Sequence, residues 1–310
     1  MYGKATETAV RAFQEQRSLP VDGVCGPITW SAVVEAGYRL GDRLLYDRRP
    51  MLRGDDVARL QRRLDELGFD PRRVDGIFGP DTRTALEDFQ RNAGLVCDAV
   101  CGPETLSTLE RLGRVAGTAA QPGSVAAMRE EERLRCAPRT LTGRRVAVGH
   151  TGDLDALAAA VARSLRDAGA VVVPLQHPDE SVQATAANDA DADAYIGLAT
   201  VGGAAGRTAD GPSDRPGCTV AHYAGHGYES PGGRRLAGLI SAALAAVLGS
   251  EGCAAQGMNL PILRETRMPA VVCRMGPPST VVQRSGAIAR AVSAAVGDWA
   301  RAPFDDPGAP

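Results

Sequence analysis

The stretch Leu263–Ser279, LRETRMPAVVCRMGPPS, contains the strand around which the carboxyl-terminal half of this chain is organised. A polar lead-in precedes the apolar run Ala270–Cys273, and a Gly-Pro-Pro sequence closes the stretch. A short apolar run bounded by turn residues is typical of a buried strand. Arg274 follows the run directly, so we expect its side chain where a buried strand ends.

The sequence around this strand alternates between short apolar runs and helical patterns from residue 143 to residue 302. Strands are predicted at 146–149, 171–175, 194–199, 219–223 and 270–273, and helices at 154–168, 181–188, 234–248 and 285–299. This alternation predicts an α/β domain with a mostly parallel sheet flanked by helices. A glycine-rich loop at 202–217 lies within it.

An internal repeat occupies the first part of the chain. Phe13-Gln14 recurs 76 residues later as Phe89-Gln90, and the sequences around the two pairs align without a gap. The complete second copy, residues 50–114, predicts a small all-α module of three helices, with apolar residues at helical spacing. These residues are Val57, Leu60, Leu64, Leu67, Leu86, Phe89, Leu106, Leu109 and Leu112.

The first copy, residues 1–40, is a truncated module that lacks the opening helix, so we expect Val10, Phe13 and Leu19 to be half covered or docked on the second copy. Cys25 and Cys101 occupy the same repeat position, which suggests small packing residues. Residues 115–142 are predicted to be a linker that includes a short solvated helix around the charged run REEERLR.

The second copy, GDDVARLQRRLDELGF followed by VDGIFGPDTRTALEDFQ, resembles the peptidoglycan-binding domain found on many cell-wall hydrolases. The resemblance implies that the recurring residues bind peptidoglycan: Asp75, Gly76, Gly79, Thr82, Phe89 and Gln90. A purely structural interpretation is also open, because turn glycines favour positive φ and Thr82 fits the start of a helix.

Composition excludes several classes of function. A net charge of −2 does not suggest nucleic-acid binding, and no apolar run approaches the roughly 20 residues that a membrane span needs. Seven dispersed cysteines do not form a recognisable disulfide framework, so we expect reduced thiols. No signal peptide is recognised, and we therefore expect a cytoplasmic protein, or an exported one if the sequence is truncated at its start.

The strand at 270–273 after its LRETRMP lead-in resembles the last active-site strand of zinc-dependent N-acetylmuramoyl-L-alanine amidases, and the order of elements is similar throughout. That family continues the strand with Val-Glu-Leu-Gly-Phe, whose Glu is the general base, and holds zinc with His, Glu and His. Here the base position is Arg274, the second His position is Ala199, and only His150 remains. Asp153 or Asp155 could replace the zinc-binding Glu only by shifting.

The resemblance therefore implies a degenerate site with no zinc expected and no catalytic residue, in which Arg274 and the loop 202–217 shape a cleft that faces a ligand or partner. A relocated metal site is a weaker possibility, built from His222 and His226 with His150 or His177.

The tandem modules ahead of a degenerate amidase domain resemble the CwlM-type group of actinobacterial proteins. That resemblance implies a cytoplasmic pseudoenzyme that regulates peptidoglycan synthesis, with the precursor-synthesis enzyme MurA, a Ser/Thr kinase and peptidoglycan or a muropeptide precursor as partners. Two alternatives stay open. One is an active zinc-dependent amidase, and the other is a non-catalytic protein that senses muropeptides through the old cleft.

Overall fold

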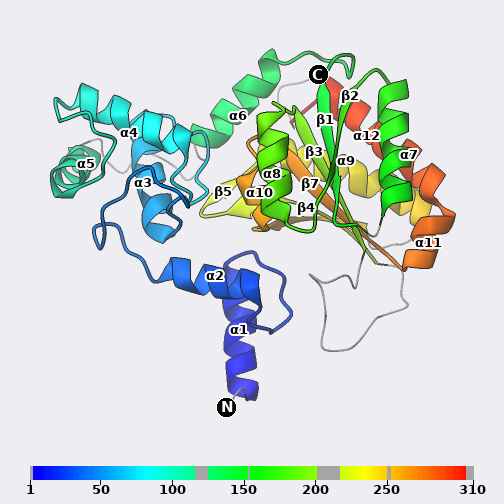
Figure 1. The fold of residues 1–310 in the computed structure, drawn as a ribbon, viewed down its shortest axis with the longest axis horizontal. Coiled ribbons are helices and arrows are strands. Elements are labelled where there is room, and N and C mark those ends of the chain that lie inside the picture. The colour runs from blue at the N-terminus through cyan, green and yellow to red at the C-terminus, as the bar shows by residue number, and fades with distance from the viewer. Residues whose placement is uncertain (1–2, 116–124, 153, 201–216, 250–252, 305–310) are drawn as a thin grey trace. The chain divides into compact units, whose positions relative to one another are not determined.

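The computed structural model describes residues 3–115, 125–152, 154–200, 217–249 and 253–304 (Figure 1). The chain separates into two compact units. The helical unit comprises residues 24–130 and 225–228, and the α/β unit comprises 1–23, 131–224 and 229–310. The division falls after Gly23 and after Glu130, inside the predicted first module and the predicted linker.

The helical unit contains α2 (Pro27–Ala36), α3 (Asp55–Glu66), α4 (Pro80–Asn92), α5 (Pro103–Val115) and the start of α6 (Val125–Cys136). Helices α3, α4 and α5 are the three predicted for the second copy, and their apolar residues form one buried cluster. Leu112 is the exception, because it stays exposed on α5. Proline at the first position of α2, α4 and α5 suits a helix start, where the backbone N–H has no partner within the helix.

Helix α6 corrects the expectation of a solvated helix between the domains. Ala126, Glu130 and Leu134 are all buried, so one side of the helix is covered. Within the helical unit, Arg129 on α6 forms an ion pair with Asp65 at 2.9 Å, and the backbone N–H of Ala126 donates to the same carboxylate. The charged run therefore belongs to a packed helix.

The first copy of the repeat is divided between the two units. Helix α1 (Lys4–Gln16) and the turn after it belong to the α/β unit, and α2 belongs to the helical unit. Val10 and Phe13 are half-buried as expected, and Leu19 is buried. Beside Leu19, the carbonyl of Ser18 accepts a hydrogen bond from the backbone N–H of Asn259 at 2.7 Å.

The α/β unit is built on one sheet with the strand order β2-β1-β3-β7-β4-β5, and β6 also pairs with β4. Its strands are β1 (Arg145–His150), β2 (Val171–Gln176), β3 (Ala194–Thr200), β4 (Gly217–Gly225), β5 (Tyr228–Glu229), β6 (Cys253–Met258) and β7 (Ala270–Gly276). Neighbours from β2 to β7 are parallel, whereas β4 is antiparallel to β7 and parallel to β6. The sheet is mostly parallel, as predicted.

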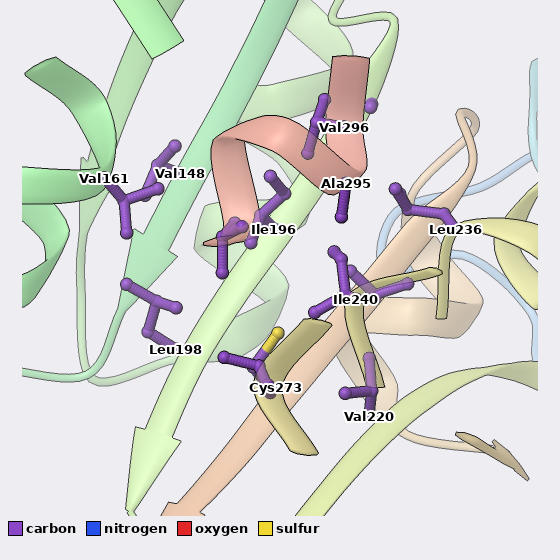
Figure 2. Close-up of a cluster of buried hydrophobic side chains, with 14 of the residues drawn as sticks. Val148, Val161, Ile196, Leu198, Val220, Leu236, Ile240, Cys273, Ala295 and Val296 are labelled. Carbon is purple, nitrogen blue, oxygen red and sulfur yellow. The ribbon is translucent and has the colours of Figure 1, made fainter. Parts of the chain in front are cut away.

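Helices cover both faces of this sheet (Figure 1). The core face packs on α7 (Asp155–Asp167), α9 (Pro231–Leu248) and α12 (Ser285–Arg301), and these helices and the strands together form the large apolar cluster in Figure 2. Helices α8 (Glu180–Asp189) and α10 (Pro261–Glu265) pack on each other and on strands β2 and β7 from the other side. Trp299 is fully buried on α12 and donates from Nε1 to the carbonyl of Gly232.

The sequence did not predict β5, β6, α10 or α11 (Pro278–Gln283). These elements are short, and β6 has the sequence CAAQGM, which lacks the run of branched apolar residues that marks a buried strand. Its position is fixed by pairing with β4, which is a contact between residues 35 apart in the sequence.

A disulfide joins β4 to β6 and corrects the expectation that the cysteines are all reduced. Cys218 and Cys253 are register partners on the two strands and are bonded to each other, while Cys25, Cys97, Cys101, Cys136 and Cys273 are free. This pairing was not predictable from the sequence, because an odd number of dispersed cysteines does not reveal which strands will be neighbours.

We expect unreduced, denatured protein to react with five maleimide equivalents per chain, and reduced protein with seven. Buried thiols require denaturation before labelling, because burial raises the pKa of both Cys101 and Cys273 to about 12. A variant with Cys218→Ser and Cys253→Ser should give five equivalents in both conditions. Seven equivalents before reduction would contradict the disulfide.

Candidate functional site

Three parallel strands end side by side at the edge where the sequence placed the candidate site. In the register of the sheet, His150 at the end of β1 lies opposite Leu198 on β3, and Ala199 lies opposite Arg274 on β7. In α/β sheets, ligands bind outside the carboxyl ends of such strands. The structure therefore brings Ala199 and Arg274 together as neighbours.

The alternation of side chains along the strands separates His150 from these two residues. Leu198 and Cys273 point into the apolar core beneath α7, α9 and α12, so Ala199 and Arg274 point to the opposite face, toward α8. A Cβ added to Gly149 would lie 2.2 Å from Gln183 Oε1 on α8, which places Gly149 on that same face. His150, the next residue, then points toward α7, away from Arg274.

The contacts of His150 agree with this direction. Its Nε2 lies 3.8 Å from Asp155 Oδ1 on the first residue of α7, and its Nδ1 accepts a hydrogen bond from the backbone N–H of Gly152. The Asp155 carboxylate also accepts from Gln176 Nε2 at 2.8 Å. His150 is buried and held by local contacts at the end of β1.

Arg274 has a carboxylate neighbour that the sequence did not identify. Burial lowers the pKa of Arg274, and the negative charge of Glu180, the first residue of α8, opposes that shift. Burial likewise raises the pKa of Glu180, opposed by a hydrogen bond from the N–H of Ile262 and by the charge of Arg274. Arg274, at the position that the resemblance assigns to the base, is therefore a half-buried guanidinium under the electrostatic influence of the Glu180 carboxylate.

In three turns of the chain, a buried glutamine side chain forms the same hydrogen bonds to an aspartate and to backbone N–H groups. Gln61 donates from Nε2 to Asp75 and Thr82, and its Oε1 accepts from the N–H groups of Asp75 and Gly76. Gln90 makes the same contacts with Asp98, Thr105 and the N–H of Ala99. In the α/β unit, Gln14 pairs in the same way with Asp22 and Gly23.

The predicted peptidoglycan-binding residues differ in how far they are exposed to solvent. Thr82, Phe89 and Gln90 are at most 2% exposed, so their side chains pack inside the module. Burial favours the structural interpretation of these three, and their role in binding stays a prediction. Asp75 and Gly79 are partly exposed and Gly76 is buried at positive φ in the turn, and a ligand contact by these three also stays a prediction.

Comparisons with known proteins place these features in a family. Residues 1–33 and 53–109 match the peptidoglycan binding domain family. The chain is 34% identical over 303 residues to the N-acetylmuramoyl-L-alanine amidase CwlM of Mycobacterium tuberculosis, covering 89% of this chain and 72% of that relative. The chain belongs to the CwlM-type family.

Other relatives of the CwlM-type chain match over shorter spans. The N-acetylmuramoyl-L-alanine amidase CwlL of Bacillus licheniformis is 30% identical over 119 residues, about a third of each protein. The solved catalytic domain of CwlV, an N-acetylmuramoyl-L-alanine amidase from Bacillus (Paenibacillus) polymyxa, is 16% identical with a TM-score of 0.39 and covers 50% of this chain and 97% of that domain.

Within the described residues, the zinc site that the amidase resemblance implies is not assembled. A catalytic zinc needs three protein ligands that converge on an open position. Among the described residues, no group of three or more His, Cys, Asp or Glu side chains lies close enough to hold a metal. His150 points away from Arg274, and Asp153 and most of the loop 202–217 lie outside the described residues.

The relocated site built on His222 and His226 is not supported either. His222 lies opposite Val271, at the other end of β7 from Arg274, and its Nε2 is 2.7 Å from Glu229 Oε1. His226 lies 3.8 Å from Asp55 within the helical unit, and His177 makes local contacts with Asp179. Each imidazole of the CwlM-type chain has its own separate neighbours.

No helix in the described part of the chain is both long and apolar enough to cross a membrane.

Proposed function

We propose that this CwlM-type chain binds peptidoglycan or a muropeptide precursor without cleaving it, and regulates cell-wall synthesis. The observation that carries the proposal is the pairing of Ala199 with Arg274 at the carboxyl edge of the sheet. Catalysis by the amidase mechanism needs a metal ligand at the position of Ala199 and a general base at the position of Arg274. An alanine and a guanidinium can supply neither function.

Electrostatics support the same conclusion. A guanidinium keeps its proton near neutral pH, so it cannot accept one from water. Its positive charge, half-buried beside β3, also opposes the binding of a divalent cation at this edge. The same charge is suited to a carboxylate or phosphate on a ligand, since arginine binds such groups through paired hydrogen bonds.

The partner within the cell is proposed from the family resemblance. We infer that the chain acts on a precursor-synthesis enzyme such as MurA, in the cytoplasm, under control of a Ser/Thr kinase. The disulfide between Cys218 and Cys253 weighs toward the exported alternative, because disulfides persist mainly in oxidising compartments. The two locations are distinguished by blocking free thiols while intact cells are denatured and counting the blocked thiols per chain: five indicates the disulfide-bonded form and seven the reduced form.

An active amidase is the second candidate, favoured by the peptidoglycan-binding modules and by the names of the relatives. Two measurements separate it from the first. We expect protein incubated with zinc and then dialysed against a weak chelator to retain far less than one zinc per chain. We also expect no release of stem peptide from purified peptidoglycan, although the protein should sediment with it.

A known zinc amidase, treated in parallel, is the positive control for both assays. Stoichiometric zinc together with peptide release would contradict the proposal and establish the amidase. The regulatory part is tested separately, by the rate of the precursor-synthesis enzyme with the chain in excess, before and after treatment with the kinase. An unchanged rate in both conditions would remove the proposed regulation.

A further inference from the structure

Helix α2 presents an uncharged apolar stripe to solvent. The stripe consists of Val24 and Cys25 in the turn before the helix and of Trp30, Val33 and Val34 on the helix, and all five are exposed. Trp30 is 61% exposed and Val33 is 40% exposed. The single charged residue of α2, Glu35, is buried, so no charge on the helix interrupts the stripe.

The second copy of the repeat shows what such a stripe packs against. The residues 76 positions later are Val100, Cys101, Leu106, Leu109 and Glu110. Leu109 is 1% exposed, Cys101 is buried, and Leu106 packs on the same apolar cluster. The equivalents of Cys25, Trp30 and Val33 are therefore buried or partly buried in the second copy, whereas Val100 is partly exposed and Glu110 is exposed.

In the second copy, α3 and the segment before it cover the residues that are equivalent to the α2 stripe. Leu60 and Leu64 on α3 belong to the cluster that contains Leu109, and Leu45 exchanges two backbone hydrogen bonds with Cys101. Helix α3 is amphipathic, with its buried residues at the spacing that packs on a neighbouring helix and its arginines on the outside. No described residue covers the α2 stripe in the same way, since its side chains remain exposed.

We propose that the α2 stripe is a docking surface for an amphipathic helix of the α3 kind, supplied by another polypeptide segment. The partner is defined by chemistry: apolar side chains at the spacing of Val57, Leu60, Leu64 and Leu67, and charged residues on the remaining face. Helices that dock in this way contact their partner through residues at i, i+3, i+4 and i+7. The apolar residues Trp30, Val33 and Val34 follow the matching i, i+3, i+4 spacing.

The two tryptophans of the chain make the test direct. Trp30 is exposed on the stripe and Trp299 is fully buried in the α/β core, so Trp30 reports on the stripe by its emission wavelength. The probe is a synthetic peptide with the sequence of residues 50–69, PMLRGDDVARLQRRLDELGF, which contains no tryptophan. Titrating it into the full chain should give a saturable blue shift.

Matched variants locate the binding site. Val33→Asp and, independently, Val24→Asp should weaken peptide binding at least tenfold, because each places a charge in the stripe. Val282→Asp is the control, since Val282 is exposed on α11 and should leave binding unchanged. A peptide with Leu60→Asp and Leu64→Asp should not bind. Circular dichroism of each variant confirms that the fold is retained.

Three results would overturn the proposal. One is the absence of a saturable shift, or equal affinity in the Val33→Asp and parent chains. Another is a dimer of the chain alone that Val33→Asp dissociates, which would make a second copy the occupant. The last is a shift caused by a soluble muropeptide but not by the helix peptide, which would make Trp30 a platform for a glycan.

Discussion

Replacing Gln61 with leucine is expected to lower the free energy of unfolding of the helical unit by about 3–5 kcal/mol. The buried amide donates to Asp75, Thr82 and the carbonyl of Ile77, and it accepts from the N–H groups of Asp75 and Gly76. Leucine has a similar size but no polar atom, so buried Gly76 and Thr82 lose their bonds to the amide away from water, whereas Asp75 is partly exposed. Each buried group left unsatisfied costs about 1–3 kcal/mol.

Hydrogen exchange measured on the full chain separates this effect from a general loss of stability. Faster exchange should be concentrated in the turn at residues 75–77 and in the start of α4, with the α/β unit little changed. Gln16→Leu is the matched control, because Gln16 is an exposed glutamine at the end of α1. If Gln61→Leu exchanged no faster than this control, the hydrogen-bonded turn would not be what holds the module together.

The second large effect is expected from Gly149→Ala in β1, which we predict to destabilise the α/β unit by about 2–4 kcal/mol. The new Cβ would lie 2.2 Å from both Gln183 Oε1 and Tyr195 Oη. These two atoms are joined by a buried hydrogen bond of 2.9 Å, and the other end of the Gln183 amide donates to the carbonyl of His150. The methyl group therefore forces apart a polar network that cannot reach water.

Urea denaturation of the α/β unit measures this change, and Gly238→Ala provides the control. Gly238 lies on the exposed side of α9 with open space around its Cα, so alanine there should stabilise the helix by up to about 1 kcal/mol. The two substitutions add the same methyl group and should change stability in opposite directions. A Gly149→Ala chain as stable as the parent would mean that α8 can move away from β1 at little cost.

Much of the fold was predictable because its signals are local. The apolar runs at 146–149, 194–199 and 270–273 became β1, β3 and β7, since a buried strand needs only a short stretch of branched apolar residues. The helices at 154–168 and 285–299 became α7 and α12 for a similar reason, with Leu157 and Trp299 on the buried side. Short elements such as β6 escaped, because their sequences carry little apolar pattern.

The candidate site was also predictable only in part. The sequence and its family resemblance selected Ala199 and Arg274, and the register of β3 with β7 places them opposite each other. Glu180 was missed, although it follows Asp179, which caps α8 by accepting a hydrogen bond from the N–H of Ser181. Its nearness to Arg274 depends on how α8 packs on the sheet, and no local pattern encodes that packing.

The sequence alone determined the repeated helical module, the mostly parallel sheet and the presence of an arginine at the end of its last predicted strand, because each is written in spacing or residue type. Tertiary structure alone decided that His150 turns away from Arg274, that Cys218 meets Cys253, and that Thr82 and Gln90 are interior residues. It also decided that Val33 is exposed where Leu109 is buried. These outcomes depend on which distant segments become neighbours, and burial and pairing arise only once those segments have packed.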